Sequence, residues 1–316
     1  MRYKEFGKTG MKVSEMCLGT WGFGNVGWDE YDDATRIDAF VAAVENGINF
    51  VDTAPVYGKG ASEKLVGKCL KEVDRSKVFV STKCGNVCID PMTYVRHGHH
   101  DEIIAGVEDS LKNLQTDYID LYLLHWPDPN VEVEETLGAM QELKDSGVVK
   151  HIGVSNFTKE QLERVLKVAD VEALQPQYSM VSTESEELMK WASANGVANM
   201  TYGSIGGGIL TGKFREPRTD FKPEDSRNRF YKHFHEPMFW DVMKVVEEMD
   251  KIAASRGIPV VQVAINWAAQ KDFVHTCIIG AQTRDKVLQN CAAFDWELTA
   301  EEIAVLDKAI ADNLKK

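Results

Sequence analysis

A short apolar run followed by an amphipathic helical segment recurs along the whole chain, and this repeat constrains the possible folds more than any other feature of the sequence. Strands that are apolar on both faces and separated by helices pair in parallel through crossover connections. Eight such strands close naturally into a barrel, so the repeat predicts the α/β class and a single (β/α)8 TIM barrel. The eight apolar runs, many with β-branched residues, are 16–18, 48–51, 78–80, 119–124, 149–154, 172–174, 197–200 and 275–279.

The helical segments between these runs end where a helix needs a left-handed residue. Gly47, Gly147, Gly196 and Gly257 directly follow four of the segments, which is the position that a helix C-cap favours. We find no linker and no low-complexity tract, so residues 1–316 are expected to form one domain. The predicted helical segments are 34–46, 62–71, 102–114, 133–146, 159–169, 185–195, 238–256 and 283–293.

Two segments lie outside the repeat. Phe6 and Val13 flank a turn sequence from Gly7 to Gly10, which predicts an N-terminal β-hairpin that caps the bottom of the barrel. The stretch 203–237 follows the seventh strand, is rich in Gly, Arg and aromatic residues, and lacks periodicity. A loop of this length in a compact domain is typically functional.

The overall charge disfavours several classes of partner. With 36 Lys and Arg against 49 Asp and Glu, the formal net charge is −13, which repels nucleic acid and anionic membrane surfaces. No apolar run approaches the ~20 residues of a membrane span, and no apolar segment follows the charged start as in a secretory signal. Six scattered cysteines fit a reducing compartment, so we expect a cytoplasmic protein.

Gly22, Gly24 and Gly27 form a G-x-G-x-x-G pattern after the first apolar run. In a Rossmann turn this pattern opens directly into a helix whose amides hold a pyrophosphate. Here the acidic stretch 28–33 follows instead and would repel that anion. We therefore interpret these glycines as a flexible loop above the first strand.

Polar side chains stand at the carboxyl ends of three successive predicted strands. Asp52, Lys83 and His125 each follow an apolar run, and in a barrel their side chains would converge at the mouth where such enzymes keep their chemistry. Taken singly, Asp52 could be a loop cap, Lys83 a solvated residue at a strand end, and His125 a histidine of the core. An acid, a base and an imidazole on neighbouring strands together favour a catalytic site.

Tyr57 leaves the second strand through a turn at Pro55 and can hang over the same mouth. A nearby ammonium stabilises a phenolate, so we expect Lys83 to lower the pKa of Tyr57 and Asp52 to hold Lys83 in place. Tyr57 could then donate or accept a proton near neutral pH, while His125 donates to a carbonyl oxygen and orients it.

The sequence resembles the aldo-keto reductase family over nearly the whole chain. The resemblance rests on four blocks that occur in the family's order, namely 49–58, 81–83, 117–127 and 153–157. It implies a (β/α)8 barrel that binds a nicotinamide cofactor without a Rossmann fold. It also implies a catalytic tetrad of Asp52, Tyr57, Lys83 and His125.

The same resemblance implies the cofactor contacts. Ser155, Asn156 and Gln175 would hold the carboxamide, Tyr202 would stack on the nicotinamide, segment 205–213 would embrace the pyrophosphate, and segment 280–290 would receive the adenosine end. The complete set comprises Gly19, Thr20, Trp21, Ser155, Asn156, Gln175, Tyr202, Gly203, Ser204, Ile205, Gly206, Leu210, Gly212, Lys213, Gly280, Ala281, Gln282, Thr283, Lys286, Gln289 and Asn290.

Three glycines depart from the family pattern at the cofactor site. Gly203 replaces a more usual Ser, and Gly207 stands where many relatives have an Arg that binds the pyrophosphate. The segment that begins at Gly280 lacks the cation often found near the 2′-phosphate. The start of the last barrel helix, with Thr283 and with Arg284 or Lys286, would have to meet that phosphate. We therefore expect a preference for NADP(H) that is smaller than in relatives, with NAD(H) also possible.

Other candidate residues have simpler interpretations. Trp21 and Trp126 lie beside the tetrad strands and are predicted walls of the substrate pocket. Cys84 and Cys88 are interpreted as packing thiols. The histidines at 97, 99 and 100 lack the Cys or carboxylate spacing of a zinc site, so no metal site is predicted.

Together these features predict an NAD(P)(H)-dependent oxidoreductase. It would transfer a hydride between nicotinamide and the carbonyl of a small aldehyde, ketone or sugar, with Tyr57 as general acid and base. Two alternatives remain: an NAD-dependent sugar dehydrogenase that works in the oxidative direction, and a cofactor-sensing regulatory subunit.

Overall fold

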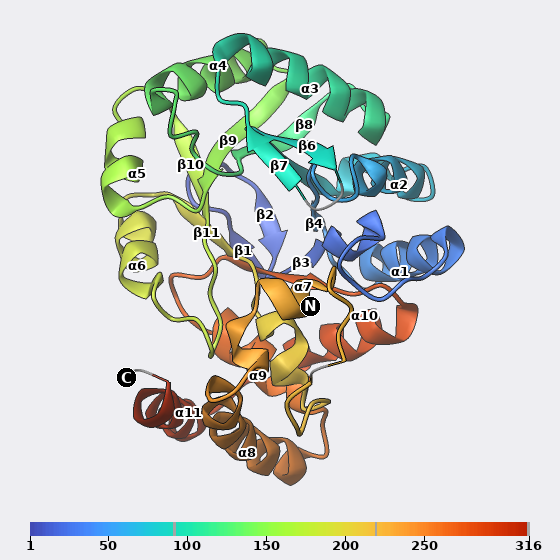
Figure 1. Ribbon diagram of the computed structural model, residues 1–316, viewed down its shortest axis with the longest axis vertical. Helices are drawn as coiled ribbons and strands as arrows, with labels where there is room; N and C mark the ends of the chain where they lie inside the picture. The colour runs from blue at the N-terminus through green and yellow to red at the C-terminus, as the bar shows by residue number, and fades with distance from the viewer. Residues whose placement is uncertain (91–92, 219, 315–316) are drawn as a thin grey trace.

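The computed structural model describes residues 1–90, 93–218 and 220–314. Its centre is a closed barrel of parallel strands in the order β10-β11-β12-β3-β4-β5-β8-β9 (Figure 1), which confirms the predicted (β/α)8 TIM barrel. The barrel strands are β3 (Met16–Gly19), β4 (Phe50–Asp52), β5 (Phe79–Cys84), β8 (Ile119–Leu124), β9 (Val149–Ser155), β10 (Val171–Gln175), β11 (Ala198–Thr201) and β12 (Thr276–Gly280).

Most barrel strands read as continuous apolar runs because both of their faces are buried. All six residues of β8 are buried, and its single acid, Asp120, accepts hydrogen bonds from the Val80 amide at 2.9 Å and from Arg75 at 2.7 Å. The register places Asp52 opposite Ser81, and Lys83 opposite Leu123. Polar side chains at the carboxyl ends of neighbouring strands are thereby brought to one level.

Helices surround the barrel strands (Figure 1). Several begin at a side-chain cap, for example α5, where the Thr158 hydroxyl accepts from the Gln161 amide. The surrounding helices are α1 (Asp33–Glu45), α2 (Ala61–Cys69), α3 (His100–Leu114), α4 (Val133–Asp145), α5 (Lys159–Val165), α6 (Glu186–Ala194), α9 (Val260–Ala269) and α10 (Arg284–Cys291).

The helix between the last two barrel strands differs from the sequence-based expectation. The predicted segment forms α8 (Met238–Arg256), but it lies outside the ring of helices against α11 (Ala300–Asn313), and α9 packs against β12 instead. Nearly every residue of α9 is buried, so this helix has no polar face and no amphipathic period to detect.

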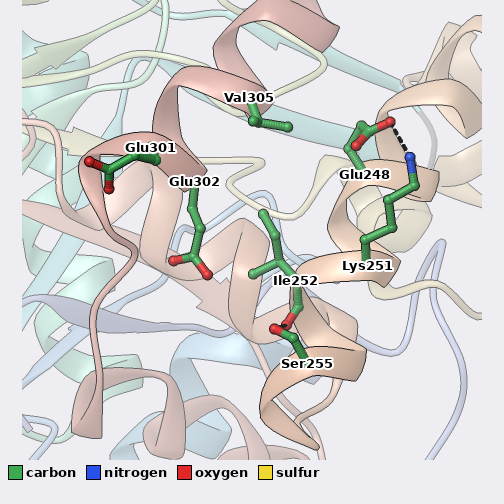
Figure 2. Close-up of a pocket in the computed structure, with 7 residues that line it drawn as sticks. All are labelled: Glu248, Lys251, Ile252, Ser255, Glu301, Glu302 and Val305. Carbon is green, nitrogen blue, oxygen red and sulfur yellow. Dashed lines mark hydrogen bonds and ion pairs between the residues drawn. The ribbon is translucent and has the colours of Figure 1, made fainter.

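A shallow hollow lies between α8 and α11, on the outside of the barrel (Figure 2). Three of its charged side chains are paired locally: Lys251 donates to Glu248 at 2.6 Å, and Glu302 accepts from Arg256 at 2.6 Å. The hollow is therefore a seam between two surface helices. It is lined by Glu248, Lys251, Ile252, Ser255, Glu301, Glu302 and Val305.

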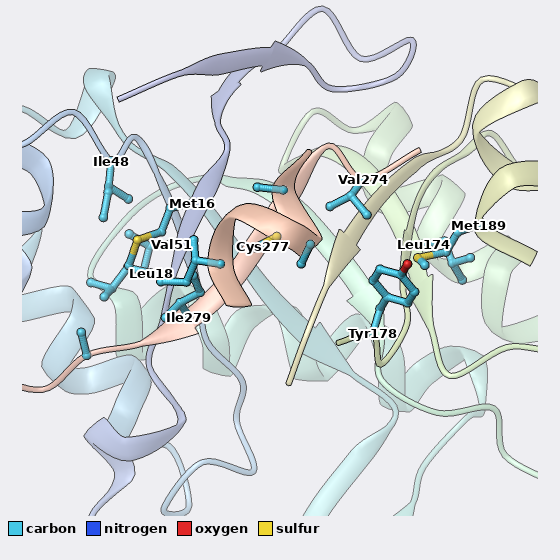
Figure 3. Close-up of a cluster of buried hydrophobic side chains, with 14 of the residues drawn as sticks. Met16, Leu18, Ile48, Val51, Leu174, Tyr178, Met189, Val274, Cys277 and Ile279 are labelled. Atoms are coloured by element: carbon cyan, nitrogen blue, oxygen red, sulfur yellow. The ribbon is translucent and has the colours of Figure 1, made fainter. Parts of the chain in front are cut away.

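The N-terminal hairpin of β1 (Tyr3–Glu5) and β2 (Lys12–Ser14) caps the barrel, as expected. Phe6 packs edge to face on Phe50, with ring centroids 5.4 Å apart, inside a cluster formed by inward-facing residues of the strands. Alternate strand residues point outward and pack under the helices, where Met16 and Val51 belong to the larger cluster of Figure 3.

Further elements extend from the carboxyl end of the barrel. An unpredicted antiparallel hairpin of β6 (Asn86–Asp90) and β7 (Thr93–Arg96) follows β5. The predicted long loop after β11 is present, and its described part contains η3 (Gly206–Thr211), α7 (Ser226–Arg229) and η4 (Lys232–Phe234). The shorter 3-10 segments elsewhere are η1 (Trp21–Gly24), η2 (Arg75–Lys77) and η5 (Ala292–Asp295). Within the described ranges, no helix is both long enough and apolar enough to cross a membrane.

Candidate active site

Lys83 is the centre of a buried polar cluster at the carboxyl ends of β4 and β5. Its side chain is 0% exposed, and its Nζ donates to Asp52 Oδ2 at 2.7 Å, to the Thr53 carbonyl at 2.8 Å and to Tyr57 OH at 3.3 Å. An ammonium carries three protons, and here it has three acceptors. The lysine is therefore held in one orientation beneath the tyrosine hydroxyl.

Asp52 is held equally firmly through its other oxygen. Its Oδ1 accepts from Ser81 Oγ at 2.8 Å and from Gln175 Nε2 at 2.9 Å. Ser81 is the register partner of Asp52 on β5, so the parallel pairing of the two strands itself delivers this contact. With both oxygens satisfied, Asp52 anchors Lys83 in this position.

The pKa of Tyr57 departs from the sequence-based expectation. Burial raises the pKa of the phenol, and although Lys83 acts in the opposite sense, the net shift is upward. The expected lowering is therefore wrong for the protein as it stands. Two effects raise the pKa of Tyr57. Removal from water destabilises the phenolate, and the negative charge of Asp52 offsets part of the stabilisation that Lys83 provides.

Lys83 itself remains charged. Burial alone would lower the pKa of Lys83, but the charge of Asp52 and the interactions with Asp52 and Tyr57 outweigh burial and raise it. A permanently cationic lysine at 3.3 Å from the phenol stabilises any negative charge that develops on that oxygen.

His125 directly follows β8 and packs beside the tyrosine. Its ring centroid lies 6.2 Å from that of Tyr57 in an edge-to-face arrangement, and its backbone N–H donates to the Cys84 carbonyl at 3.0 Å. Burial, aided by the positive charges of Lys83 and Arg96, holds the pKa of His125 well below its usual range. The imidazole is therefore neutral near pH 7 and offers a single N–H to a carbonyl oxygen.

A cavity of about 710 Å³ opens above this cluster and is lined by Asp52, Tyr57 and His125. Most of the residues expected to bind cofactor also line it: Gly19, Thr20, Trp21, Ser155, Asn156, Gln175, Tyr202, Gly203, Ser204, Ile205, Lys213, Gly280, Gln282, Lys286, Gln289 and Asn290.

Five other residues expected to bind the cofactor are not among those that line the cavity. Leu210 and Ala281 are buried in the apolar core, and Thr283 caps α10 by accepting from the Lys286 amide at 3.4 Å. The Gly206 carbonyl accepts from the buried His233 ring at 2.8 Å, and Gly212 lies close to Arg215 and Val260. Their neighbours Gly207, Gly208 and Thr211 line the cavity.

The residues expected to hold the nicotinamide are bonded to one another. Tyr202 OH donates to Asn156 Oδ1 at 2.8 Å, and Asn156 Nδ2 donates to the His125 carbonyl at 3.0 Å. Ser155 Oγ donates to the Gln175 carbonyl at 2.8 Å. The Gln175 amide nitrogen already donates to Asp52. The Gln175 Oε1 atom would therefore have to accept the hydrogen bond from a cofactor carboxamide.

The glycine-rich segment after β11 forms a cradle that only glycine allows. Gly206, Gly207 and Gly208 all have positive φ, and a Cβ on Gly207 would lie 2.6 Å from Cδ2 of Tyr231. Tyr231 therefore occupies the space that a side chain at this position would need. Gly207, Gly208 and Lys213 line the same cavity, and the cation of Lys213 suits a pyrophosphate, so the residues present fit a nicotinamide dinucleotide.

The sequence left Arg284 and Lys286 as alternative partners of a 2′-phosphate, and the structure places the two side chains differently. Arg284 is bonded to α1, with its Nη2 2.7 Å from Asp38 Oδ1 and its Nη1 3.4 Å from Glu45 Oε2. Lys286 lines the cavity and donates to Tyr31 OH at 3.2 Å. Lys286 is therefore the better placed of the two to meet a 2′-phosphate.

Two loops meet across the mouth of the cavity. Arg227 Nη2 lies 3.0 Å from Asp29 Oδ1, and the Ser226 amide donates to the Gly27 carbonyl at 2.9 Å. The loop after β3 is thus joined to the long loop after β11. Sequence analysis identified the long loop as functional but did not single out Arg227.

Aromatic rings wall the space next to Tyr57. Trp21 stacks on Tyr57 with centroids 5.9 Å apart, and Trp126 also lines the cavity, as expected for the substrate pocket. Sequence analysis missed several lining residues on the two loops and on the unpredicted hairpin, where no periodicity or motif marks them. They include Asn86, Tyr94, Trp28, Phe230 and Tyr231.

The cysteines and histidines that the sequence singled out have simple surroundings in the structure. Cys84 is buried, donates to the Leu123 carbonyl at 3.5 Å and has a pKa raised by burial, as suits a packing thiol. Cys88 lines the cavity, and burial raises its pKa as well. His99 and His100 lie on the surface, bonded to Glu135 at 3.1 Å and Glu142 at 3.0 Å.

Comparison with known proteins identifies the family. The model of the Aldo/keto reductase family matches residues 15–311. Aldo-keto reductase YhdN of Bacillus subtilis (strain 168) is 38% identical over 99% of this chain and 96% of its own. The NADH-specific methylglyoxal reductase of Escherichia coli (strain K12) is 29% identical over the full length of both chains. The structure of the glycerol dehydrogenase AKR11B4 from Gluconobacter oxydans superposes with a TM-score of 0.88 at 32% identity, over 97% of this chain and 94% of that one. The chain belongs to the aldo/keto reductase family of oxidoreductases.

Proposed function

We propose that the protein transfers a hydride between a nicotinamide cofactor and the carbonyl carbon of a small aldehyde, ketone or sugar. The observation that carries this proposal is the contact of 3.3 Å between Lys83 Nζ and Tyr57 OH at the floor of the cavity. A phenol held against a buried ammonium is a proton donor whose conjugate base is stabilised. The bound cofactor supplies or accepts the hydride.

Each member of the cluster has a distinct role in this proposal. His125 is neutral and orients the carbonyl oxygen by donating its N–H. Tyr57 delivers its proton to that oxygen as the alkoxide develops. Lys83 stabilises the negative charge left on the phenol oxygen, and Asp52 keeps Lys83 in position.

The raised pKa of Tyr57 keeps the phenol protonated near neutral pH, which is the state that carbonyl reduction requires. The same groups serve oxidation when the phenolate forms at higher pH. The relatives named above include a methylglyoxal reductase and a glycerol dehydrogenase, which supports a small carbonyl and alcohol pair as the substrate class.

We propose NADP(H) as the preferred cofactor, with NAD(H) also accepted. Lys286 supports a preference for the 2′-phosphate, whereas the pairing of Arg284 with Asp38 supports a small one. One relative is an NADH-specific enzyme, which supports NAD(H) as an alternative cofactor. All six cysteines, which lie within the described ranges, are free thiols, and this supports a reducing, cytoplasmic location.

The direct test is a spectrophotometric screen. Oxidation of NADPH and of NADH at 340 nm is followed with small aldehydes, ketones and sugars, and the reverse reaction is run with the matching alcohols. Turnover that disappears in Tyr57→Phe supports the proposal. Tight cofactor binding without turnover on any of these substrates would instead favour a cofactor-sensing regulatory subunit.

A further inference from the structure

Glu63 is a fully buried acid that the proposed mechanism does not use. It is 0% exposed on α2, and its carboxyl group accepts from two neutral side chains, Thr82 Oγ1 at 2.7 Å and Asn113 Nδ2 at 3.0 Å. Burial raises the pKa of Glu63, although these two hydrogen bonds act in the opposite sense. Glutamate is almost never fully buried unless its oxygens are engaged, so the two partners indicate what this residue holds together.

The first turn of α2 is continuous with the turn that carries Tyr57. The Ser62 amide donates to the Tyr57 carbonyl at 3.1 Å. On its other side the Tyr57 turn is in close contact with the loop after β3, because a Cβ on Gly58 would lie 2.1 Å from the Gly24 carbonyl oxygen. Tyr57 and Glu63 therefore belong to one closely held stretch of backbone.

Thr82 joins this stretch to the strand that carries Lys83. Side chains alternate along β5, so Lys83 points into the barrel and Thr82 points outward to α2, where it meets Glu63. The pairing of β4 with β5 ends at Asp52, and Tyr57 lies beyond this ladder. The contact between Glu63 and Thr82 therefore links the two backbones beyond the point where the sheet links them.

The contact between Lys83 Nζ and Tyr57 OH is sensitive to small displacements. At 3.3 Å it lies near the outer limit of a hydrogen bond, so a shift of about a few tenths of an ångström between the two backbones would break it. The other two bonds of the ammonium, to Asp52 at 2.7 Å and to Thr53 at 2.8 Å, are shorter and would keep the lysine in place. A looser fit between α2 and β5 would therefore act on the phenol and leave the salt bridge intact.

We propose that Glu63 is a positioning residue, which holds the Tyr57 hydroxyl within reach of the Lys83 ammonium by bonding Thr82. The inference rests on the proposed function, in which Lys83 stabilises the phenolate of Tyr57. Coulomb attraction falls with distance, and the hydrogen bond is lost altogether, so a longer separation raises the pKa of Tyr57. Alcohol oxidation needs the phenolate, so its pH dependence reports this change.

Thr82→Val removes the hydroxyl that bonds to Glu63 and keeps the shape of the side chain. The pH–rate profile of alcohol oxidation is expected to move to higher pH by about half a unit or more, so that kcat at pH 8 falls about threefold or more. Because Thr82 does not line the cavity, KM for the alcohol and the dissociation constant of the cofactor are expected to stay within about twofold of wild type. Thr82→Ser restores the donor and is expected to restore the profile. A profile that does not move in Thr82→Val, or that stays displaced in Thr82→Ser, would overturn the inference.

Thr136→Val is the matched control, because it also removes one buried threonine hydroxyl. Thr136 is 1% exposed on α4, and its hydroxyl donates to the Gly98 carbonyl at 2.6 Å, away from the residues that line the cavity. The control is expected to lower the Tm about as much as Thr82→Val and to leave the profile in place. The titratable groups around Tyr57 are the same in every variant, namely Lys83, Asp52, Cys17 and His125. An equal shift in Thr136→Val would make the change a general effect of lost stability and would count against a positioning role.

Glu63→Met replaces the carboxyl group with an apolar side chain of similar length. Because Glu63 acts through Thr82, Glu63→Met combined with Thr82→Val is expected to move the profile no further than Thr82→Val alone. Shifts that add would show that Glu63 acts by another route, contrary to the inference. If Glu63→Met does not fold, the Thr82 variants and their control decide the question by themselves.

Lys83→Met separates this inference from the function on which it rests. If Lys83→Met moves the profile to higher pH and Thr82→Val does not, the pairing of Lys83 with Tyr57 is retained and the inference alone is overturned. If the wild-type protein reduces no carbonyl and oxidises no alcohol with either cofactor, the proposed function is overturned and this inference falls with it.

Discussion

The ammonium nitrogen of Lys83 lies 3.3 Å from the hydroxyl oxygen of Tyr57. Lys83 is fully buried and Tyr57 half-buried at the cavity, and Asp52 holds the lysine from the other side at 2.7 Å. This arrangement keeps the phenol protonated near neutral pH while it stabilises the phenolate that forms when the proton is transferred.

Tyr57→Phe removes only the hydroxyl group and is expected to abolish most carbonyl reduction. General acid–base catalysis contributes about 10²–10⁴-fold, so turnover is expected to fall by at least that factor. Cofactor affinity, measured by fluorescence quenching, is expected to stay near the wild-type value. Turnover above about a tenth of wild type would exclude Tyr57 as the proton donor.

Lys83→Met removes the cation that stabilises the Tyr57 phenolate. The pKa of Tyr57 is already raised by burial, and without Lys83 it is expected to rise further. Alcohol oxidation needs the phenolate, so its pH–rate profile is expected to move to higher pH and its rate at pH 8 to fall. Asp52→Asn is expected to act in the same direction but less strongly. A profile that did not move, with an undiminished rate, would refute the pairing.

His125 is expected to stay neutral between pH 5.5 and 8 because burial holds its pKa well below the usual range. His99 and His100 are exposed beside carboxylates, which raise their pKa values, so they provide an internal contrast. An NMR titration of the imidazole protons, with His125 assigned through His125→Asn, measures both. Titration of His125 near pH 6.5 would contradict its role as a neutral donor.

Cofactor choice is expected to depend on Lys286 and not on Arg284. NADP(H) is expected to bind about tenfold to a hundredfold more tightly than NAD(H), as one exposed cation and helix-terminal amides allow. Lys286→Ala is expected to reduce this ratio, whereas Arg284→Ala, which breaks the contact to Asp38, is the matched control. Dissociation constants at two salt concentrations measure the effect, since salt weakens binding of the extra phosphate. Equal constants with equal salt dependence would make this an NAD enzyme.

Arg227→Ala is expected to speed the release of bound cofactor. The variant breaks the contact of 3.0 Å to Asp29 that joins the two loops across the cavity. Because the pair is partly exposed, the expected change in dissociation rate is about twofold to fivefold, measured by stopped-flow displacement. Arg215→Ala is the control, because Arg215 bonds to Asp250 and does not line the cavity. An unchanged rate in Arg227→Ala would show that the loops open independently of this contact.

Much of the architecture can be predicted from local pattern. The repeat of apolar runs and amphipathic segments predicts the barrel, and Phe6 and Val13 predict the hairpin beneath it. Asp52, Lys83 and His125 can be placed at one mouth because parallel strands put their carboxyl ends on the same side. These inferences need only the spacing of side chains along the chain, which the sequence displays directly.

Other features depend on neighbours that are distant in sequence. The helix α9 is buried all round and therefore lacks the polar face by which a helix is recognised. Arg284 could be directed at either the cofactor or α1, and only its contact with Asp38 decides between them. Asn86 belongs to no motif, and only the fold brings Arg96 to its amide oxygen.

The pKa of Tyr57 shows the physical reason most clearly. The residues of the tetrad predict that a cation stands beside the phenol, and the structure agrees. The net direction of the shift depends on how much water the fold excludes from that oxygen and on how far Asp52 offsets the lysine. Burial and opposing charges are sums over the whole three-dimensional surroundings, so only the tertiary structure decides which of them prevails.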